Sequence, residues 1–233
     1  MDIAILGYGR MGKEIEKAAI SRGHNIVLKV DKDTIEYDIT EADVAIDFSV
    51  PASAVGNIAN CLNNGVPVVS GTTGWLADYE KITTLCKQRK GAFIYASNFS
   101  LGVNIFFELN KKLAEMMAPL EQYKVSMEEI HHTNKLDAPS GTAITLAEGI
   151  IENSAYKQWA LEVAKANEIP IVAKRIPEVP GTHAVMYHSE VDTLEIKHTA
   201  HNRKGFALGA VVASEWLVGK TGVFSMRDVL NLG

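Results

Sequence analysis

Short apolar runs alternate with helical apolar spacing along the first hundred residues. The run Asp-Ile-Ala-Ile-Leu at residues 2–6 predicts a buried strand, and the pattern at 13–22 predicts a helix that follows it. The segment 34–43 leaves little room for a full helix. The same alternation predicts strands at 25–30, 44–49, 66–70 and 92–96, with helices at 51–62 and 77–89. Strands and helices in this order predict an α/β domain with a doubly wound parallel sheet.

The pattern changes after residue 100. Alternation around Val125 and Met127 predicts a strand, and Pro180-Gly181 and 190–193 predict turns. The expected helices lie at 101–117, 142–151, 155–167 and 206–217, and three expected antiparallel strands lie at 171–176, 183–189 and 194–200. The elements up to residue 200 predict a separate α+β unit.

A glycine-rich loop, Gly7-Tyr-Gly-Arg-Met-Gly12, joins the first strand to the first helix. This is the context that a dinucleotide fingerprint requires. Gly7 permits the tight turn, Gly9 lets the backbone approach a pyrophosphate, and Gly12 allows close packing of the helix. The phosphates would face the helix N-terminus. We therefore expect a site for a nicotinamide dinucleotide.

Asp31 follows the strand at 25–30, where an acidic residue takes the ribose hydroxyls of the adenosine half. It favours NADH, whereas the neighbouring Lys32 could meet a 2′-phosphate and keep NADPH usable. The alternative for 31–33 is a charged turn after a strand. The glycine loop before it favours the cofactor site.

Two further loops follow expected strands. Gly-Thr-Thr-Gly at 71–74 and Ser-Asn-Phe-Ser at 97–100 both lie at carboxyl ends, which is where ligands bind in open α/β sheets. The loop 71–74 could equally be a plain glycine-rich turn. Its position favours a contact on the nicotinamide side of the cofactor.

The stretch 129–143 concentrates the titratable groups of the chain. Pro139 ends any helix before it, and Ser140 can cap the next one. The amides of Gly141 and Thr142 would then face outward and, beside a lysine, could bind an anion such as a carboxylate.

Each part of this stretch also has an ordinary interpretation. A histidine is usually structural, a loop lysine such as Lys135 is usually solvated, and the helix entry is common. His131 and His132 would point to opposite faces of an extended segment. The combination within a dozen residues favours a site for acid/base chemistry on an anionic substrate.

Composition excludes several classes of protein. The 233 residues are 47% apolar, enough for a real core, and the net charge of −5 offers no basic surface for nucleic acid. No apolar run has the length of a membrane span, and the first residues enter a strand without a signal peptide, so we expect a cytoplasmic protein. Cys61 and Cys86 stand apart from any metal-binding motif and are expected to be reduced, buried thiols, with no disulfide and no metal site.

Six motifs give the chain its resemblance to a known family, and they span its whole length: 7–12, Asp-Phe-Ser at 47–49, 71–74, 97–104, 131–143 and Met-Arg-Asp-Val-Leu at 226–230. The sequence resembles the 4-hydroxy-tetrahydrodipicolinate reductases, also called dihydrodipicolinate reductases. The motif at 131–143 is highly specific. Two departures lie at the adenosine end: the glycine loop is one residue shorter than in many members, and the connection after Asp31 is short.

The resemblance implies an NAD(P)H-dependent reduction of 4-hydroxy-tetrahydrodipicolinate, a cyclic dicarboxylate, in lysine and diaminopimelate biosynthesis. It implies a Rossmann domain of residues 1–100 and 206–233. It also implies an inserted domain, 101–205, that binds substrate and assembles a homotetramer. Both crossings between the domains, 99–102 and 202–206, are expected to act as hinges.

The resemblance also implies roles for individual residues. His131 and Lys135 would be the acid/base pair, with the donor of the proton left open between them. Substrate contacts would come from His132, Ser140, Gly141 and Thr142. Cofactor contacts would come from Gly7, Tyr8, Gly9, Arg10, Met11, Gly12, Asp31, Lys32, Gly71, Thr72, Thr73, Ala96, Ser97, Asn98 and Phe99.

Two other functions compete with the reductase. A different Rossmann dehydrogenase would share the first half of the chain but would have no need of the stretch 131–143. A non-catalytic dinucleotide-sensing protein would bind NADH without turnover, and the histidine and lysine pair argues against it.

Overall fold

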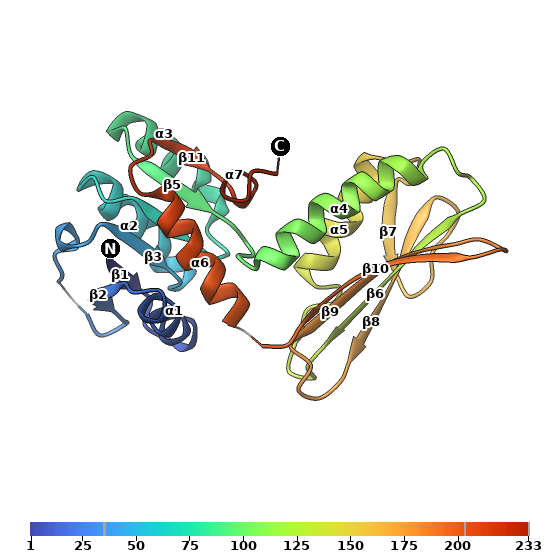
Figure 1. The fold of residues 1–233 in the computed structure, drawn as a ribbon, viewed down its shortest axis with the longest axis horizontal. Helices are drawn as coiled ribbons and strands as arrows, with labels where there is room; N and C mark the ends of the chain where they lie inside the picture. Colours follow the sequence, from blue (N-terminus) through green and yellow to red (C-terminus); the bar gives the residue numbers. More distant parts are fainter. Residues whose placement is uncertain (35, 203, 233) are drawn as a thin grey trace. The chain divides into compact units, whose positions relative to one another are not determined.

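In the computed structural model the chain forms two units, each with its own sheet (Figure 1). The structure describes residues 1–34, 36–202 and 204–232. One unit comprises Met1–Leu101 together with Lys204–Gly233, and the other comprises Gly102–Arg203. The chain therefore leaves the first unit and returns to it after the second.

The first unit is a six-stranded sheet in the order β11-β5-β4-β3-β1-β2, with every neighbouring pair parallel. From β1, the strand β2 is added on one side and β3, β4 and β5 on the other, so the strand order reverses between β1 and β3, as in a doubly wound fold. The strands are β1 Asp2–Leu6, β2 Asn25–Val30, β3 Val44–Asp47, β4 Val68–Ser70, β5 Ala92–Tyr95 and β11 Gly222–Phe224. The helices are α1 Arg10–Ser21, α2 Pro51–Asn63, α3 Tyr79–Arg89, α6 Lys204–Leu217 and α7 Met226–Val229, with short 3₁₀ turns at Ile39–Glu41 and Leu76–Asp78.

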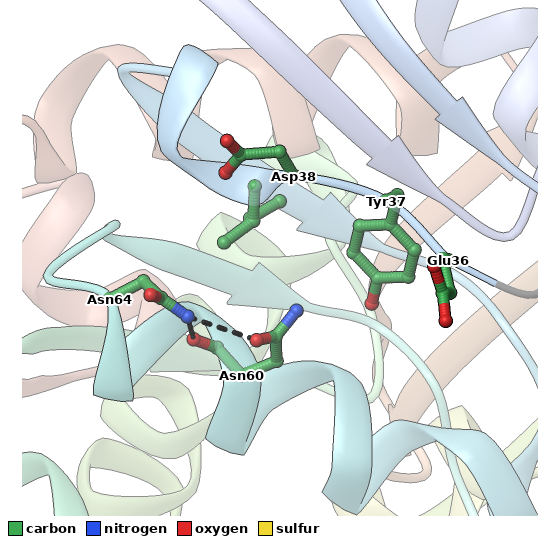
Figure 2. A pocket seen from close by; sticks show the side chains of 6 residues that line it. Glu36, Tyr37, Asp38, Asn60 and Asn64 are labelled. Atoms are coloured by element: carbon green, nitrogen blue, oxygen red, sulfur yellow. Dashed lines mark hydrogen bonds between the residues drawn. The ribbon is translucent and has the colours of Figure 1, made fainter.

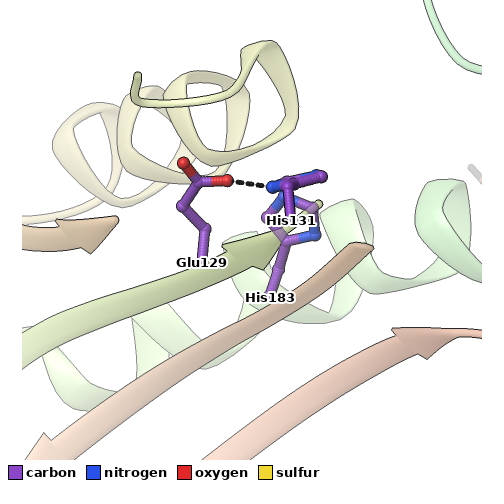
Figure 3. Close-up of side chains that lie close together, drawn as sticks. All are labelled: Glu129, His131 and His183. Carbon is purple, nitrogen blue, oxygen red and sulfur yellow. Dashed lines mark ion pairs between the residues drawn. The ribbon is translucent and has the colours of Figure 1, made fainter. Parts of the chain in front are cut away.

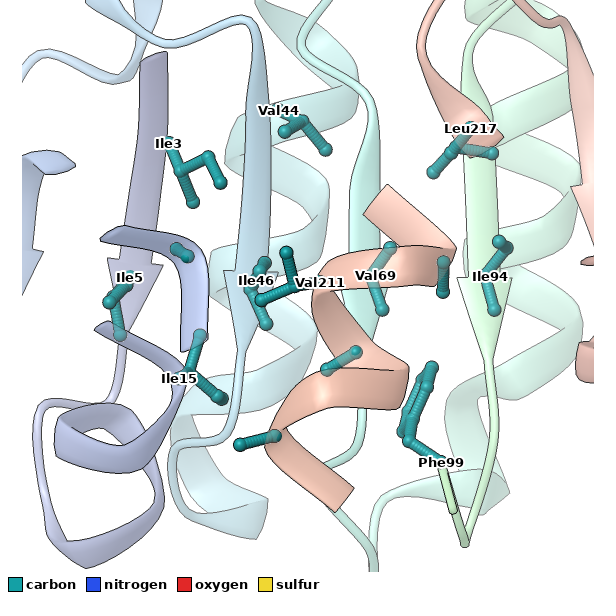
Figure 4. Close-up of a cluster of buried hydrophobic side chains, with 14 of the residues drawn as sticks. Ile3, Ile5, Ile15, Val44, Ile46, Val69, Ile94, Phe99, Val211 and Leu217 are labelled. Atoms are coloured by element: carbon teal, nitrogen blue, oxygen red, sulfur yellow. The ribbon is translucent and has the colours of Figure 1, made fainter. Parts of the chain in front are cut away.

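Both faces of the sheet are buried along its central strands β1, β3, β4 and β5, which explains why these strands are almost wholly apolar. Ile3 and Ile5 of β1 pack on the side of α1 and α6, where Figure 4 shows Ile15 and Val211 against the strands. The alternate residues of β1 join a second core with α2 and α3. The expected parallel α/β sheet is confirmed, and the only described helix between β2 and β3 is a single 3₁₀ turn.

The C-terminal segment contributes more than a helix to this unit. β11 pairs in parallel with β5 and becomes an edge of the sheet, and α7 follows it with a capping box at Ser225 and Asp228. The sequence did not predict this sixth strand, because three residues carry too little periodicity to be recognised.

The second unit is a mixed sheet in the order β10-β9-β6-β8-β7, and α4 and α5 share an apolar core with its strands. Its elements are α4 Leu101–Met117, β6 Lys124–His131, α5 Gly141–Glu152, β7 Gln158–Leu161, β8 Glu168–Arg175, β9 Gly181–His188 and β10 Thr193–Ala200. In β6 the buried residues alternate strictly, so Val125, Met127, Glu129 and His131 share one face. That face carries the candidate chemistry.

Two expectations for this unit are wrong. No helix forms at 155–167: residues Gln158–Leu161 make β7, an edge strand parallel to β8, and Glu162 and Asn167 adopt left-handed conformations that end helical geometry on either side. The strand β8 does not pair with β9 either, although the two strands run in opposite directions. It pairs in parallel with β6, which separates the two.

Several smaller expectations can be compared with the structure. Cys61 and Cys86 are free and buried, as expected. Among the described residues, no helix combines the length and apolar character that crossing a bilayer requires. The proposed hinge at 202–206 includes residue 203, which lies outside the described residues. The two hinges therefore stay a prediction.

Candidate active site

The three glycines of the loop after β1 have different surroundings. Gly7 adopts φ +97°, and a Cβ there would lie 2.3 Å from the carbonyl oxygen of Phe48. A Cβ at Gly12 would lie 2.4 Å from the carbonyl oxygen of Gly7. Gly9, in contrast, faces open space, with no atom within 4 Å of its would-be Cβ. Packing explains Gly7 and Gly12, whereas Gly9 leaves room for a ligand to approach the backbone.

A hollow of about 520 Å³ lies beside this loop. The carboxylate of Asp31 at its edge accepts hydrogen bonds from the amide of Asp33 (2.9 Å) and the hydroxyl of Thr34 (3.3 Å), which hold it in place. The lining residues are Gly7, Tyr8, Gly9, Val30, Asp31, Lys32, Thr34, Tyr37, Phe48, Ser49, Val50, Ser53 and Asn57. Five residues expected to contact the cofactor therefore meet in one hollow, and Arg10, Met11 and Gly12 form the first turn of α1 next to it.

Tyr8 is fixed at this hollow by two charged neighbours. Its hydroxyl donates to Glu16, and Lys29 lies 4.9 Å from its ring centroid while pairing with Glu16 at 2.5 Å. The hydrogen bond from Lys29, with that from Tyr8, lowers the pKa of Glu16. The ring therefore has a defined orientation before any ligand binds.

A buried carboxylate, to which no role was assigned from the sequence, organises the adjacent loops. Asp47, at the end of β3, is fully buried. One of its oxygens accepts from Ser49 (2.7 Å) and Asn57 (3.0 Å), and the other accepts from Ser70 and Thr72 (both 2.8 Å). These bonds tie the ends of β3 and β4 to α2. An aspartate that ends an apolar strand is the sequence signal that could have identified it.

The loops after β4 and β5 lie side by side, because the two strands pair and the amide of Ala96 donates to the carbonyl of Ser70 (3.2 Å). Thr72 turns its hydroxyl inward to Asp47, and the ring of Phe99 is buried in the core. Side-chain atoms of these two residues are thus engaged by the protein itself. The other expected cofactor contacts of these loops are Gly71, Thr73, Ala96, Ser97 and Asn98, and of these Thr73 and Ser97 are exposed.

In the second unit, β6 brings Glu129 and His131 together on its buried face, as Figure 3 shows. The carboxylate of Glu129 forms an ion pair with Nδ1 of His131, and its other oxygen pairs with Arg175 at 3.0 Å. Burial alone would raise the pKa of Glu129, but these two partners outweigh it and lower the pKa to about 2. Glu129 is therefore ionised throughout the physiological range.

His183, on β9, stands edge-on to His131 with 5.0 Å between ring centroids. Burial, followed by the charge of His131, lowers its pKa to about 3, so this ring is neutral. Its Nε2 lies 2.9 Å from the hydroxyl of Ser140, which also accepts the amide of Ala143 and caps α5. The expected cap of α5 by Ser140 is confirmed. His183 contacts both the Ser140 hydroxyl and the ring of His131.

The loop after β6 carries Lys135, whose ammonium donates to both carboxylate oxygens of Asp137 at 2.8 and 2.7 Å. This contact lowers the pKa of Asp137. His132 is half-buried directly after the strand, and Gly141 faces open space at the start of α5. Thr142 follows Gly141 in the first turn of that helix. The structure thus gathers the predicted residues of this unit around the end of β6 and the start of α5.

Sequence reasoning missed Glu129, Arg175 and His183. Glu129 could have been found, because period-two alternation puts it on the face of His131. Arg175 and His183 are distant in sequence, and only the pairing of β6 with β8 and β9 brings them to the site.

Two other hollows contain none of the residues predicted to form the site. One of about 430 Å³ in the first unit lies between the segment 36–39 and α2 (Figure 2). The amide of Asn64 donates to the side-chain oxygen of Asn60 at 3.0 Å, so these polar groups partner each other. A hollow of about 560 Å³ in the second unit lies near the C-terminal ends of α4 and α5. None of the predicted site residues lines either hollow.

The first unit has a glycine loop at the switch point of a doubly wound sheet, and the second has a histidine and lysine cluster beside a helix start. Together they define an oxidoreductase of the Rossmann type. Residues 1–99 match the family described as dihydrodipicolinate reductase, N-terminus, and residues 102–230 match its C-terminus. The chain belongs to the dihydrodipicolinate reductase family.

Individual relatives agree with this assignment. The chain is 61% identical to the 4-hydroxy-tetrahydrodipicolinate reductase of Christiangramia forsetii over 99% of its length and 98% of the relative. It is 35% identical to that of Methanoregula boonei, over 82% and 75%. A solved structure, the dipicolinate-bound dihydrodipicolinate reductase from Paenisporosarcina sp. TG-14, aligns over 97% of both chains with a TM-score of 0.78 and 24% identity, and supports the fold.

Proposed function

We propose that this chain reduces 4-hydroxy-tetrahydrodipicolinate to tetrahydrodipicolinate with NADH or NADPH, in the route to diaminopimelate and lysine. The observation that carries the proposal is the 61% identity, over almost the full length, to a reductase of that name. The cluster around His131 and Lys135 supplies the acid/base and charge groups that the reaction needs.

The hollow beside Gly9 suits the adenosine half of the cofactor. Gly9 offers backbone without an obstructing side chain, and the carboxylate of Asp31 is held where it can accept from ribose hydroxyls. Lys32 lines the same hollow and can meet a 2′-phosphate. When bound, the nicotinamide supplies the hydride. The loops 71–73 and 96–99 would contact the cofactor on its nicotinamide side.

The substrate is a ring with two carboxylates, and the second unit offers matching positive groups. The N-terminus of α5, where Gly141 and Thr142 lie, carries the positive end of the helix dipole and favours an anion. Lys135 supplies a full positive charge, and His132 supplies a ring nitrogen that can donate a hydrogen bond. In this role Lys135 would exchange its contact with Asp137 for one with the substrate.

Hydride addition to a conjugated imine leaves negative charge that a proton must neutralise. We assign this proton to His131, because imidazole exchanges protons near neutral pH and because an ionised Glu129 backs this ring. Lys135 then acts as the fixed charge that holds the substrate and stabilises the developing anion.

The same family membership supports a cytoplasmic homotetramer. In the second unit the sheet face opposite α4 and α5 carries the half-buried side chains of Ile130, Val172 and Met186. This face would pair with another copy. A monomeric mass by light scattering at micromolar concentration would contradict the tetramer.

Complementation tests the function in a cell. A bacterium that lacks its own reductase, and therefore requires diaminopimelate, should grow without it when this chain is expressed. A Lys135→Ala variant produced to the same level is the negative control. Failure of the wild-type chain to support growth, with soluble protein present, would contradict the proposal.

A further inference from the structure

The nitrogen of His131 that faces the protein is closed to any ligand. Nδ1 is buried and in ion-pair contact with the carboxylate of Glu129. Only 11% of the His131 side chain is exposed, so any exchange of a proton with a substrate has to use Nε2. A Cβ at residue 181 would lie 3.0 Å from Nε2, and Gly181 leaves that space open.

Arg175 connects the carboxylate behind His131 to the loop that carries the lysine. Its guanidinium donates to Glu129 at 3.0 Å, to the carbonyl of Asp137 at 2.7 Å and to the carbonyl of Lys135 at 3.3 Å. One planar cation at the end of β8 therefore holds both a side chain of β6 and the following loop. A lysine in its place could not reach all three acceptors in this geometry.

We propose that Glu129 and Arg175 are positioning residues of the active site: Glu129 keeps a proton on Nδ1 of His131 and presents Nε2 to the substrate, while Arg175 fixes Glu129 and the Lys135 loop in one arrangement. This inference rests on the role of His131 in the proposed function. It extends that function by assigning the two buried groups that make His131 a directed proton donor.

The charges around the ring agree with this assignment. Ionised Glu129 leaves the shared proton on His131, and neutral His183 does not compete for it. When Nε2 gives up its proton, the ring becomes neutral and retains its Nδ1 proton against Glu129. The titratable and charged groups near His131 are Glu129 on β6, Arg175 on β8, His183 on β9, and Lys135 and Asp137 in the loop.

A metal site is the competing interpretation, because donor atoms of Glu129, His131 and His183 lie within 4.8 Å of one another. The residues do not fit an ion. Glu129 and Nδ1 of His131 are already in direct contact, whereas ligands at about 2.0–2.2 Å from a zinc ion are held further apart. Arg175 on the same carboxylate adds a repelling charge. Loss of activity of the purified enzyme on treatment with EDTA would overturn this view and the proposal.

The Glu129→Gln variant keeps the shape and removes the charge. We expect kcat to fall by about 10²-fold with KM for the substrate changed less than about threefold. The pH at which activity declines on the basic side should move down, since the ring loses the anion that stabilises its charged form. Glu128→Gln is the matched control, because Glu128 pairs with Lys174 on the opposite face of β6. An unchanged pH profile in Glu129→Gln would overturn the proposal.

The Arg175→Lys variant separates the two parts of the proposal. It retains a cation beside Glu129 but cannot bridge to both loop carbonyls. We expect KM to rise by about tenfold while the pH profile stays close to that of the wild type. Wild-type KM together with wild-type kcat would remove Arg175 from the positioning role.

Nitrogen-15 NMR of His131 tests the inference without turnover, so it remains decisive if the proposed reaction fails. In the neutral ring at high pH the proton should reside on Nδ1. The midpoint of its titration should lie lower in Glu129→Gln, with folding checked by circular dichroism. A neutral ring that carries its proton on Nε2 in the wild type would overturn the proposal even if no variant folds. Absence of turnover with the expected tautomer would contradict only the proposed function.

Discussion

At the scale of single residues, the site depends on buried groups whose charge states are set by their neighbours. Glu129 is ionised between His131 and Arg175, and His183 is neutral a few ångströms away. Lys135 is held by Asp137 at the surface of the same unit. An ionised carboxylate and a neutral imidazole thus lie on either side of His131, and such separated charge states are typical of sites that transfer protons.

Replacing Lys135 tests the role of the charge. Lys135→Ala should lower turnover by at least about 10²-fold, the usual effect of losing one general acid or anion clamp, and leave NADH affinity nearly unchanged. Steady-state kinetics and NADH titration measure both. Lys157→Ala, at an exposed position of the same unit, is the control. Turnover similar to the wild type would place Lys135 outside the site.

Buried His183 should make the protein sensitive to acid. Its pKa is lowered to about 3 in the folded state, so the unfolded chain, with a value near 6.5, takes up the proton first. Stability is therefore lost as pH falls below 6.5, by roughly 2 kcal/mol at pH 5 from this residue. Urea unfolding of His183→Gln should show a weaker pH dependence, and His188→Gln is the control on the same strand. Parallel curves for the wild type and His183→Gln would contradict this account.

The residues that sequence reasoning identified are those in local motifs. His131, Lys135, Ser140 and the glycines of the first loop were all found in this way. Asp47 was quoted as part of a motif but received no role, because its four hydrogen bonds come from residues two to 25 positions away. Arg175 lies 46 positions from Glu129, and no spacing rule connects them.

At the scale of elements, most helices and strands were predicted near their observed positions, but β7 and β11 were not. Residues 155–167 carry apolar side chains at spacings that fit either a helix or a strand. Part of this segment forms the strand β7 because it can pair with the edge of β8. The sequence also predicted the wrong neighbour for β8, which was expected to pair with the strand that follows it. β6, about 40 residues earlier in the chain, takes that place, and hairpin rules for successive strands could not predict this.

The glycine loop gives a prediction at this scale. Gly9→Ala should keep the free energy of unfolding within about 1 kcal/mol of the wild type, because its side chain meets open space, yet weaken NADH binding by at least about tenfold. Gly7→Ala should instead destabilise the fold by about 1–3 kcal/mol, since its φ is +97° and Phe48 blocks the Cβ.

Urea unfolding and NADH fluorescence titration measure the two effects. Gly56→Ala, where a Cβ also meets open space, is the control and should bind NADH as the wild type does. Unchanged NADH affinity in Gly9→Ala would mean that this loop does not approach the cofactor.

At the scale of the whole molecule, the alternation of strands and helices was enough to predict a doubly wound unit, and the change of pattern after residue 100 was enough to predict a second one. The return of the chain to the first unit followed only from family resemblance. No local pattern shows that α6 packs against α1 or that β11 extends the first sheet. Such pairings form because helices and strands far apart in the sequence bury their apolar faces against one another.

The choice between NADH and NADPH is measured on the complete enzyme during turnover. We expect kcat/KM with NADH to be at least equal to that with NADPH, because a carboxylate at the position proposed for Asp31 would accept from ribose hydroxyls and repel a 2′-phosphate. Asp31→Asn keeps the turn to Asp33 and should shift the preference toward NADPH by roughly tenfold. Asp33→Asn is the control. A strong NADPH preference in the wild type would show that Asp31 does not face the ribose.

The central claim is that this chain is a reductase acting on 4-hydroxy-tetrahydrodipicolinate. The most direct measurement is the oxidation of NADH and NADPH by the purified protein when the substrate is generated enzymatically in the same cuvette. We expect rapid oxidation that depends on the substrate and is lost in Lys135→Ala. Binding of NADH with no substrate-dependent oxidation of either cofactor would contradict it.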